Sequence, residues 1–322
     1  MTAGNERGRG GLEGSRPRVV ATLGVFDGVH LGHGTLLERV RRRAAEEGAI
    51  PAAVTFDPPP RAVLASTPGP FQITLWPVKR LLLTEAGIER ILLLRFTKET
   101  AALSPEAFIE DLVLGEFALA GLVIGYDFRF GAKGAGDAAL LRRLGETHGF
   151  WVEEVQAVRR EGEVISSTRI REALQRGSVG EAAGLLGRPF AVQGTVIKGA
   201  GLGHRELVPT ANLVPEAEQL MPAPGVYLVQ VLVGAVAYGG VAMLGGSPTL
   251  EAHTTRLAEV HLIDFQGDLL GQLLELRFLE RMREGRRFAG IEELRRAIAA
   301  DIRMARRRLP AGGPKSACQS GG

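Results

Sequence analysis

The sequence has a single cysteine, Cys318, which lies close to the end of the 322-residue chain. One cysteine cannot form a disulfide within the chain, and this shortage is typical of proteins that fold in a reducing compartment. No uninterrupted apolar run reaches the roughly 18 residues that suggest a membrane-spanning helix. The start of the chain also lacks the apolar core of a secretory signal. We therefore expect a soluble, cytoplasmic protein with no membrane partner.

A strong charge of either sign is also lacking. The 39 basic residues nearly balance the 36 acidic ones, and the net charge is +3. This balance does not indicate a nucleic-acid partner. Hydrophobic residues make up 45% of the chain, and 322 residues exceed what one core usually supports, so we expect two globular domains. Nothing in the pattern indicates whether the chain forms oligomers.

Short apolar runs alternate with helical patterns between residue 18 and about residue 186. This alternation is typical of an α/β fold with a doubly wound parallel sheet. The expected strands are 19–23, 50–56, 90–96, 119–124 and 151–158. The expected helices are 35–47, 76–86, one that opens at Ser104, and 137–147. Residues 1–17 are rich in Gly and Arg, and we expect them to form a disordered tail.

The pattern changes near Gly187, where closely spaced β-type runs begin. They cover 190–197, 225–233, 235–243, 258–265 and 273–278, with Gly and Pro between them. Several short strands at this spacing predict a small barrel or sandwich. An amphipathic helix is expected over 291–308, and a disordered tail over 309–322. The predicted domains are therefore residues 18–186 and 187–308.

The stretch Gly24–His33, which reads GVFDGVHLGH, lies between the first expected strand and the first expected helix. In an α/β sheet, the carboxyl end of a strand and the N-terminus of a helix favour phosphate binding. Two imidazoles, His30 and His33, would add to such a site. Either histidine could instead cap a turn or satisfy a polar group in the core. A zinc site is disfavoured because no other His or Cys cluster supplies further ligands.

This stretch resembles the His-x-Gly-His signature of the nucleotidyltransferases. Its Phe-Asp-Gly-Val-His part is similar to that of the bacterial bifunctional riboflavin kinase/FAD synthetase family. The resemblance implies that His30 and His33 stabilise charge on the α- and β-phosphates of ATP. Further ATP-binding residues implied in this stretch are Gly24, Phe26, Asp27 and Gly32.

A second block, ISSTRIR at 165–171, resembles the family's triphosphate-binding segment. The resemblance implies that Ser166, Ser167 and Thr168 bind ATP and that Arg171 takes part in catalysis. Hydroxyls, backbone N–H groups and a guanidinium that converge at a helix start suit a triphosphate. Alone, the block would predict only an ordinary capped helix.

Two other blocks match the family with departures. VTFDPPP at 54–60 has Pro59 where the family has His, and by itself it predicts only a rigid turn. In VIGYDFRFGAKGAGD, at 123–137, the resemblance implies that Asp127 holds substrate or metal and that Phe128 and Phe130 line the flavin. The alternative is that the two Phe residues belong to the core. Gly134 stands where an Arg is common.

From residue 186 onward the chain resembles a riboflavin kinase domain with a six-stranded barrel. VPTANL, at 208–213, implies that Thr210 and Asn212 hold Mg²⁺-ATP, and Glu259 matches the general base. Gly199 and Gly201 are implied to wrap phosphates, and Arg283 to contact the flavin. The departures from the family pattern are Leu207, Val208, Met243, Ser247 and Gly285.

The resemblance implies conversion of riboflavin to FMN and of FMN to FAD, with ATP as donor and Mg²⁺ as cofactor. One alternative is an FMN adenylyltransferase whose barrel only binds flavin or regulates the enzyme. Another is a flavin-binding protein without catalytic activity. A nucleotidyltransferase that acts on another nucleotide would explain the first half of the chain but not the second.

Overall fold

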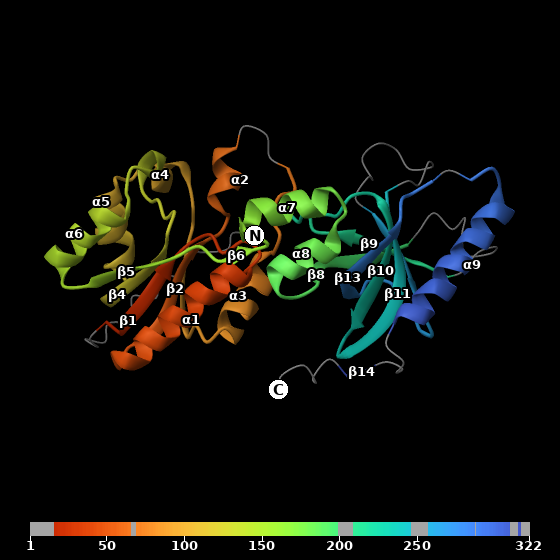
Figure 1. Cartoon of the computed structure of the whole chain (residues 1–322), viewed down its shortest axis with the longest axis horizontal. Helices are drawn as coiled ribbons and strands as arrows, with labels where there is room; N and C mark the ends of the chain where they lie inside the picture. The colour runs from red at the N-terminus through yellow and green to blue at the C-terminus, as the bar shows by residue number, and fades with distance from the viewer. Residues whose placement is uncertain are drawn as a thin grey trace. The chain divides into compact units, whose positions relative to one another are not determined.

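The computed structural model describes residues 16–65, 69–198, 209–245, 257–286 and 288–309, and the backbone of 315–316 (Figure 1). Several residues discussed above lie outside this part of the chain: Gly199, Gly201, Leu207, Val208 and Ser247. The chain divides into two compact units that are each built from separated segments. The first comprises residues 1–25, 36–64 and 84–156, and the second comprises 26–35, 65–83 and 157–322.

The first unit contains a five-stranded parallel sheet in the order β3-β2-β1-β4-β5. Its strands are β1 (Arg18–Leu23), β2 (Ile50–Phe56), β3 (Arg90–Leu94), β4 (Ala118–Gly125) and β5 (Trp151–Val155). The five predicted strands are thus confirmed. The strand order reverses between β1 and β4, and ligands of such sheets bind beyond the carboxyl ends of the strands at this reversal. The chain leaves β1 at that end and enters the histidine stretch.

Two crossover helices cover the sheet. α1 (Leu31–Glu46) joins β1 to β2, and α6 (Ala138–His148) joins β4 to β5. Crossover connections between parallel strands are right-handed. The connection from β1 to β2 and the connection from β4 to β5 move toward opposite edges of the sheet, so α1 and α6 lie on opposite faces of it. Asp137 caps α6, since its Oδ1 accepts the N–H of Leu140 at 2.9 Å. The predicted doubly wound fold is confirmed.

Shorter elements fill the other connections of the first half. They are α2 (Pro60–Leu64), α3 (Trp76–Glu85), α4 (Lys98–Ala101), α5 (Pro105–Ala107), the π-helix η1 (Phe108–Val113), the 3₁₀ turn η2 (Ala132–Gly134) and a two-stranded ribbon of β6 (Arg159–Arg160) and β7 (Glu163–Val164). Ser104 caps α5, because its hydroxyl accepts the N–H of Ala107 at 3.1 Å. The helix predicted to open at Ser104 is therefore confirmed.

The second unit contains a closed antiparallel barrel. Its strands follow the order β10-β13-β8-β9-β12-β11, and pairing of β10 with β11 closes it. The strands are β8 (Phe190–Ile197), β9 (Ala211–Pro215), β10 (Gly225–Val233), β11 (Val236–Leu244), β12 (Ala258–Leu262) and β13 (Leu273–Arg283). A short strand, β14 (Lys315–Ser316), adds to the start of β11. The predicted barrel is confirmed.

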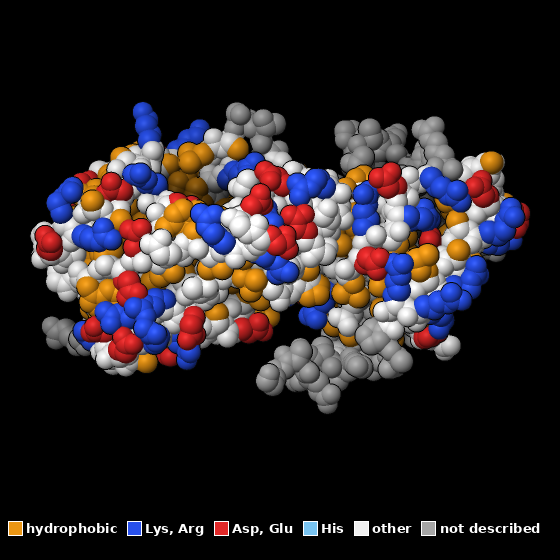
Figure 2. Space-filling view, in the orientation of Figure 1, with side chains coloured by type: hydrophobic (Ala, Val, Ile, Leu, Met, Phe, Trp, Pro, Cys, Tyr) orange, Lys and Arg blue, Asp and Glu red, His pale blue; other side chains and the backbone are white. Residues whose placement is uncertain are grey.

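The second unit also contains the helices α7 (Ser167–Gln175), α8 (Val179–Leu186) and α9 (Ile291–Arg308), and most of α3. α8 was not expected from the sequence. Buried side chains of α7 and α8 share one hydrophobic core with the barrel, including Ile170, Leu185 and Phe278. α9 is confirmed at its predicted bounds, and arginines gather along it (Figure 2). Within the described residues, no helix has both the length and the apolar character required to cross a membrane.

Candidate active sites

The histidine stretch is an irregular loop that ends in the first turn of α1. The helix begins at Leu31, four residues before the predicted start, so His33 lies inside the helix rather than in the turn before it. The N–H of Gly34 donates to the carbonyl of His30 at 2.9 Å and closes this first turn. Glycine is disfavoured in helix interiors, and this made the helix start hard to predict from Gly32 and Gly34.

The two imidazoles lie face to face. Their ring centroids are 3.6 Å apart and the ring planes differ by 14°. The ring of Phe26 meets His33 edge-on, with centroids 5.2 Å apart. A Cβ atom at Gly32 would lie 3.1 Å from the His30 ring, so the glycine leaves room for that ring. The structure therefore brings together Phe26, His30, Gly32 and His33, which the sequence analysis had grouped.

Both histidines are held neutral. Burial lowers the pKa of His30 to about 4, and the positive charges of Arg188 and Arg171 contribute to the decrease. The pKa of His33 is lowered well below its usual value, first by burial and then by the neighbouring His30 and Lys79. The backbone N–H of His33 donates to Nδ1 of His30 at 3.3 Å, which places the His30 proton on Nε2.

His33 keeps one nitrogen without a hydrogen bond. Its Nδ1 is shielded from solvent and has no partner among the described residues. An unsatisfied buried polar atom is unfavourable, by about 1–3 kcal/mol. Such exceptions need an explanation, such as local strain, a catalytic role, or a bound water or ion.

The side chain of Asp27 fixes the histidine loop through hydrogen bonds to other segments of the chain. Its side chain is buried, and Oδ1 accepts the N–H groups of Ile73 at 2.9 Å and Thr74 at 3.1 Å. Its Oδ2 accepts a hydrogen bond from Nη2 of Arg171 at 2.5 Å, and Nε of Arg171 donates to the carbonyl of Phe71 at 2.9 Å. The carboxylate is therefore fully used within the protein, which favours a role in positioning.

The start of α7 supports the same loop. Ser166 caps the helix by accepting the N–H of Arg169 at 3.3 Å, and the hydroxyl of Ser167 donates to the carbonyl of Asp27 at 2.8 Å. Thr168 is exposed. This block therefore contacts the histidine stretch through Asp27. Gly24, at the other end of the loop, donates its N–H to the carbonyl of Val54 at 3.0 Å.

The Asp127 block belongs to the first compact unit, whereas residues 26–35 belong to the second. Asp127 is exposed in a turn after β4, where the N–H of Phe128 donates to the carbonyl of Gly125 at 3.1 Å. Phe130 is buried, and its ring stacks on Phe128 with centroids 5.5 Å apart. Phe130 is therefore a core residue, as the alternative interpretation allowed.

Pro59 is buried, and its carbonyl accepts the N–H of Ala62 at the start of α2. This is the turn that the sequence predicted for VTFDPPP. Gly134 lies in η2 with a φ of +66°, a conformation that favours glycine. The two departures from the family pattern in the first half therefore have structural roles of their own.

The second group of polar residues lies on one face of the barrel. Glu259 of β12 stands directly opposite Asn212 of β9 in the antiparallel register. Side chains of such a pair lie on the same face with Cβ atoms about 5 Å apart. Glu259 and His261 alternate with the buried Val260 along β12. Thr210 lies just before β9, and His261 Nδ1 is 2.8 Å from the carbonyl of Pro209.

Burial raises the pKa of the Glu259 carboxyl above its usual value. A carboxylate whose proton affinity is increased in this way is better suited to accept a proton near neutral pH. Among the described residues, no group of three or more His, Cys, Asp and Glu side chains could hold a metal ion by itself.

Arg283 lies in the same cross-strand row as Glu259. The row passes from Glu259 to Met243, then to Val226 and then to Arg283. Three strand spacings amount to roughly 14 Å along the sheet. The guanidinium is held by Asp301 of α9, with Nε and Nη2 donating at 3.0 and 2.7 Å. Gly285 is exposed beyond the end of β13.

Two buried or partly buried cations near the histidines were not predicted. Lys79 of α3 is only 2% exposed, and its charge acts on His33. Arg188 donates hydrogen bonds to the histidine loop. A lysine in a helix pattern gives no signal of burial, and the region of Arg188 was marked in the sequence only as a domain boundary.

Three comparisons relate the chain to known proteins. The sequence model of the FAD synthetase family matches residues 13–169, and that of the riboflavin kinase family matches residues 186–309. A bifunctional riboflavin kinase/FMN adenylyltransferase of Pseudomonas fluorescens is 38% identical over 92% of this chain and 96% of the relative. The protein of that name from Escherichia coli K12 is 38% identical over 89% of this chain and 91% of its own length.

Among solved structures, one from Streptococcus pneumoniae is titled a macrolide-efflux protein. It covers 92% of this chain and 96% of its own chain, at 30% identity and a TM-score of 0.80. Most of the chain therefore shares its fold with an experimentally determined structure. Together with the two matched segments and the two relatives, these similarities show that the chain belongs to the bifunctional riboflavin kinase/FMN adenylyltransferase family.

Proposed function

We propose that this chain makes FAD in two ATP-dependent steps: phosphorylation of riboflavin to FMN, and transfer of AMP from ATP to FMN with release of pyrophosphate. The observation that carries the proposal is that segments of both families stand in one chain, each with its own group of polar side chains. We assign adenylyl transfer to residues 18–186 and riboflavin phosphorylation to residues 187–308. Adenylyl transfer alone is not favoured, because both family segments and both activities in the relatives' names are present.

In adenylyl transfer, an oxygen of the FMN phosphate attacks the α-phosphorus of ATP. The bond from that phosphorus to the bridging oxygen of pyrophosphate breaks. Both reactants are anions, so positioning and stabilisation of negative charge are the main requirements. We assign the Nε2–H of His30 as a donor to a phosphate oxygen, because Nδ1 of this ring is already an acceptor. The ring of His33 stacks on that of His30, which supports a second contact with the same phosphates.

The other residues predicted for the first site divide into two groups. Ser167 and the predicted catalytic residue Arg171 each bind Asp27, which favours a role of all three in holding the loop over direct contact with phosphate. We assign the remaining residues to the nucleotide pocket: Gly24, Phe26, Gly32, Ser166 and Thr168. We keep Asp127 and Phe128 as flavin contacts, since Phe128 is only half-buried, and assign Phe130 to the wall behind them.

In riboflavin phosphorylation, the 5′-hydroxyl oxygen of riboflavin attacks the γ-phosphorus of ATP and ADP leaves. We assign Glu259 as the general base that accepts the hydroxyl proton. Its partial burial and raised pKa support this role. We assign Arg283 to the flavin, at the far end of the row that starts at Glu259.

Mg²⁺ fits the donor chemistry of the barrel face. A hydroxyl from Thr210, an amide oxygen from Asn212 and phosphate oxygens form the kind of oxygen set that Mg²⁺ prefers. Asn212 would hold the ion next to Glu259, its cross-strand neighbour. When bound, the ion would neutralise part of the phosphate charge. Gly199 and Gly201 remain predictions for phosphate binding.

The proposal is tested with purified protein, Mg²⁺ and ATP. Riboflavin is added to one reaction and FMN to another, and the flavins are separated by chromatography. We expect FAD in both reactions. If FAD forms only in the reaction that received FMN, the assignment of riboflavin phosphorylation is overturned. If riboflavin is converted to FMN but no FAD forms in either reaction, the assignment of adenylyl transfer is overturned.

A further inference from the structure

Arg188 holds the backbone of the histidine loop. Its Nη2 donates to the carbonyl of Gly28 at 2.6 Å, and its Nη1 donates to the carbonyl of Val29 at 3.0 Å. These are the two peptide units that immediately precede His30. One planar guanidinium that binds two successive carbonyls fixes the direction of both peptide planes.

The backbone held in this way is strained. Gly28 has a φ of +89°, and Val29 has a φ of +39°. A positive φ is unfavourable for a β-branched residue such as valine. Strained residues persist only where their surroundings enforce them, and they concentrate at functional sites. The contacts of Arg188 are part of what enforces this conformation.

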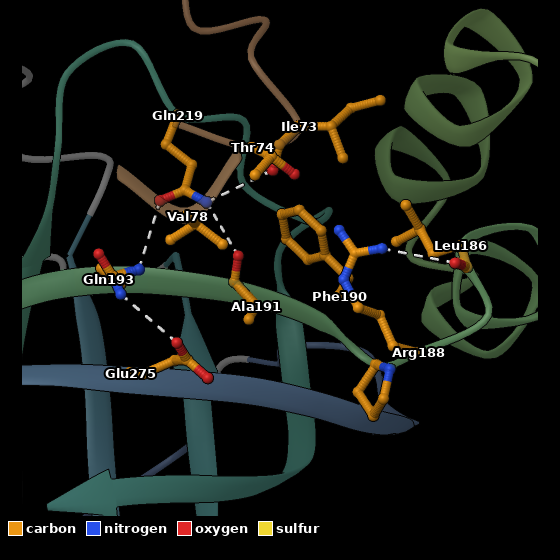
Figure 3. Close-up of a pocket in the computed structure, with 11 residues that line it drawn as sticks. Ile73, Thr74, Val78, Leu186, Arg188, Phe190, Ala191, Gln193, Gln219 and Glu275 are labelled. Atoms are coloured by element: carbon orange, nitrogen blue, oxygen red, sulfur yellow. Dashed lines mark hydrogen bonds between the residues drawn. The ribbon is translucent and has the colours of Figure 1, made fainter. Parts of the chain in front are cut away.

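Arg188 is itself held by rigid neighbours. Gly187 before it ends α8 in a left-handed conformation, with a φ of +79°, and a Cβ there would lie 2.6 Å from Leu31. Pro189 follows it, and Phe190 then enters β8 with its ring stacked on Phe278 in the barrel core. Figure 3 shows the Arg188 side chain beside Phe190 and Leu186.

The barrel also supports the segment that binds Asp27. Gln219 Nε2 donates to the carbonyl of Ala191 at 2.8 Å and reaches the carbonyl of Ile73 at 3.5 Å, as Figure 3 shows. Its Oε1 accepts the N–H of Gln193 at 3.3 Å. The cavity beside these residues is only about 30 Å³, the size of about one water, so this region is a packed support.

We propose that Arg188 is a positioning residue for adenylyl transfer: from the first residues of the riboflavin kinase segment, it fixes the strained backbone that orients His30 and His33. The proposal rests on the proposed adenylyl transfer. Arg188 lies within the segment matched by the riboflavin kinase family, whereas the loop lies in the segment matched by the FAD synthetase family. Catalytic geometry in one family segment therefore depends on a side chain from the other.

The charge of Arg188 supports the same role. It contributes to the lowered pKa of both His30 and His33. Loss of this cation would raise the proton affinity of the pair as well as release the loop. The acid limb of the pH profile for adenylyl transfer would then move to higher pH.

The test compares Arg188→Met with Arg160→Met in the full chain. Arg160 is a matched control, because its Nη1 also donates to a backbone carbonyl, that of Gly184 in α8, at 2.6 Å. For Arg188→Met we expect kcat for FAD formation from FMN to fall about 100-fold, the effect of a displacement of about 1 Å in catalytic groups. We expect KM to change little and FMN formation from riboflavin to remain as in the wild type, which also shows that the barrel is folded.

Arg188→Lys keeps the charge and some donors, so we expect it to recover part of kcat and the wild-type pH profile. Amide hydrogen exchange over residues 26–34 provides a readout that is independent of activity. We expect faster exchange there in Arg188→Met than in Arg160→Met. Unchanged exchange, or equal kcat in both variants, would overturn the proposal. Wild-type protein that makes no FAD would instead refute the proposed function, and the exchange data would still decide whether Arg188 holds the loop.

Discussion

The two candidate sites hold their functional side chains by different means. The histidine loop is irregular, and long-range contacts from Ile73, Arg171 and Arg188 fix it. The barrel site instead uses the regular register of the sheet, in which Asn212 and Glu259 are direct cross-strand neighbours. The first arrangement depends on many residues outside the site, whereas the second depends on few.

This difference implies different responses to mutation. In the loop, a change at a buried supporting residue should reduce catalysis as well as stability, because strained geometry needs its support. On the barrel face, the backbone is held by ladder hydrogen bonds that a side-chain change leaves in place. A substitution there should affect the chemistry and leave the fold intact.

The largest effect is expected for Glu259→Gln. Loss of a general base reduces the rate by about 10²–10⁴-fold, so riboflavin phosphorylation should fall by that factor while FMN adenylylation stays unchanged. Both rates are measured by chromatography of the flavins.

Because burial raises the pKa of the Glu259 carboxyl, its ionised form is unfavourable in the folded chain, and the stability of the wild type decreases as pH rises through this pKa. Glu259→Gln should therefore raise Tm slightly at neutral pH, and a lower Tm would argue against this explanation.

His33→Ala is expected to have the next largest effect. It removes one stabilising contact from the phosphates, which typically costs about 10²–10³-fold in kcat. FAD formation from FMN should fall by that factor, while riboflavin phosphorylation and the circular dichroism spectrum remain those of the wild type. A folded variant with full adenylyl transfer would refute the assignment of His33.

Asp27→Asn tests the support beneath the loop. The amide cannot neutralise Arg171, so a partly buried charge loses its partner, and we expect a stability loss of about 3 kcal/mol in urea unfolding. Asp127→Asn is the matched control, because Asp127 is exposed, and its stability should stay within about 0.5 kcal/mol of the wild type. Equal stability of the two variants would mean that the ion pair of Asp27 with Arg171 does not stabilise the loop.

An effect of similar size concerns the dependence of stability on pH. His30 has a pKa of about 4 in the folded chain against 6.5 as its ordinary value. The folded protein therefore gains stability from this residue above pH 6.5 and loses it as pH falls through 4, by about 3 kcal/mol in total. His30→Asn should make stability less dependent on pH between 6.5 and 4. If the wild type and this variant lose stability in parallel over that range, burial of His30 is not the cause.

The sequence predicted the fold well because both halves carry clear periodic patterns. β2 (Ile50–Phe56) and α9 (Ile291–Arg308) have the predicted bounds. The start of α1 was predicted four residues late, because Gly32 and Gly34 obscured the first turn. α8 was missed, since an apolar run as short as Val179–Leu186 does not distinguish a helix from a loop or strand.

The candidate sites were predictable to different degrees. Asn212 and Glu259 were grouped from family motifs, and the sheet register then placed them side by side. The supports of the histidine loop were not predictable, because Ile73 and Arg188 are distant from Asp27 and Gly28 in the sequence. Such contacts form only when the chain folds, and no local pattern indicates them.

We propose that one chain carries two separate active sites that act in sequence. A single experiment tests this by supplying riboflavin, Mg²⁺ and ATP to His33→Ala, to Glu259→Gln and to a mixture of both variants. We expect FMN without FAD from His33→Ala, neither product from Glu259→Gln, and FAD from the mixture, because released FMN passes from one variant to the other. FAD from either variant alone at the wild-type rate, or a mixture that forms none, would contradict the claim.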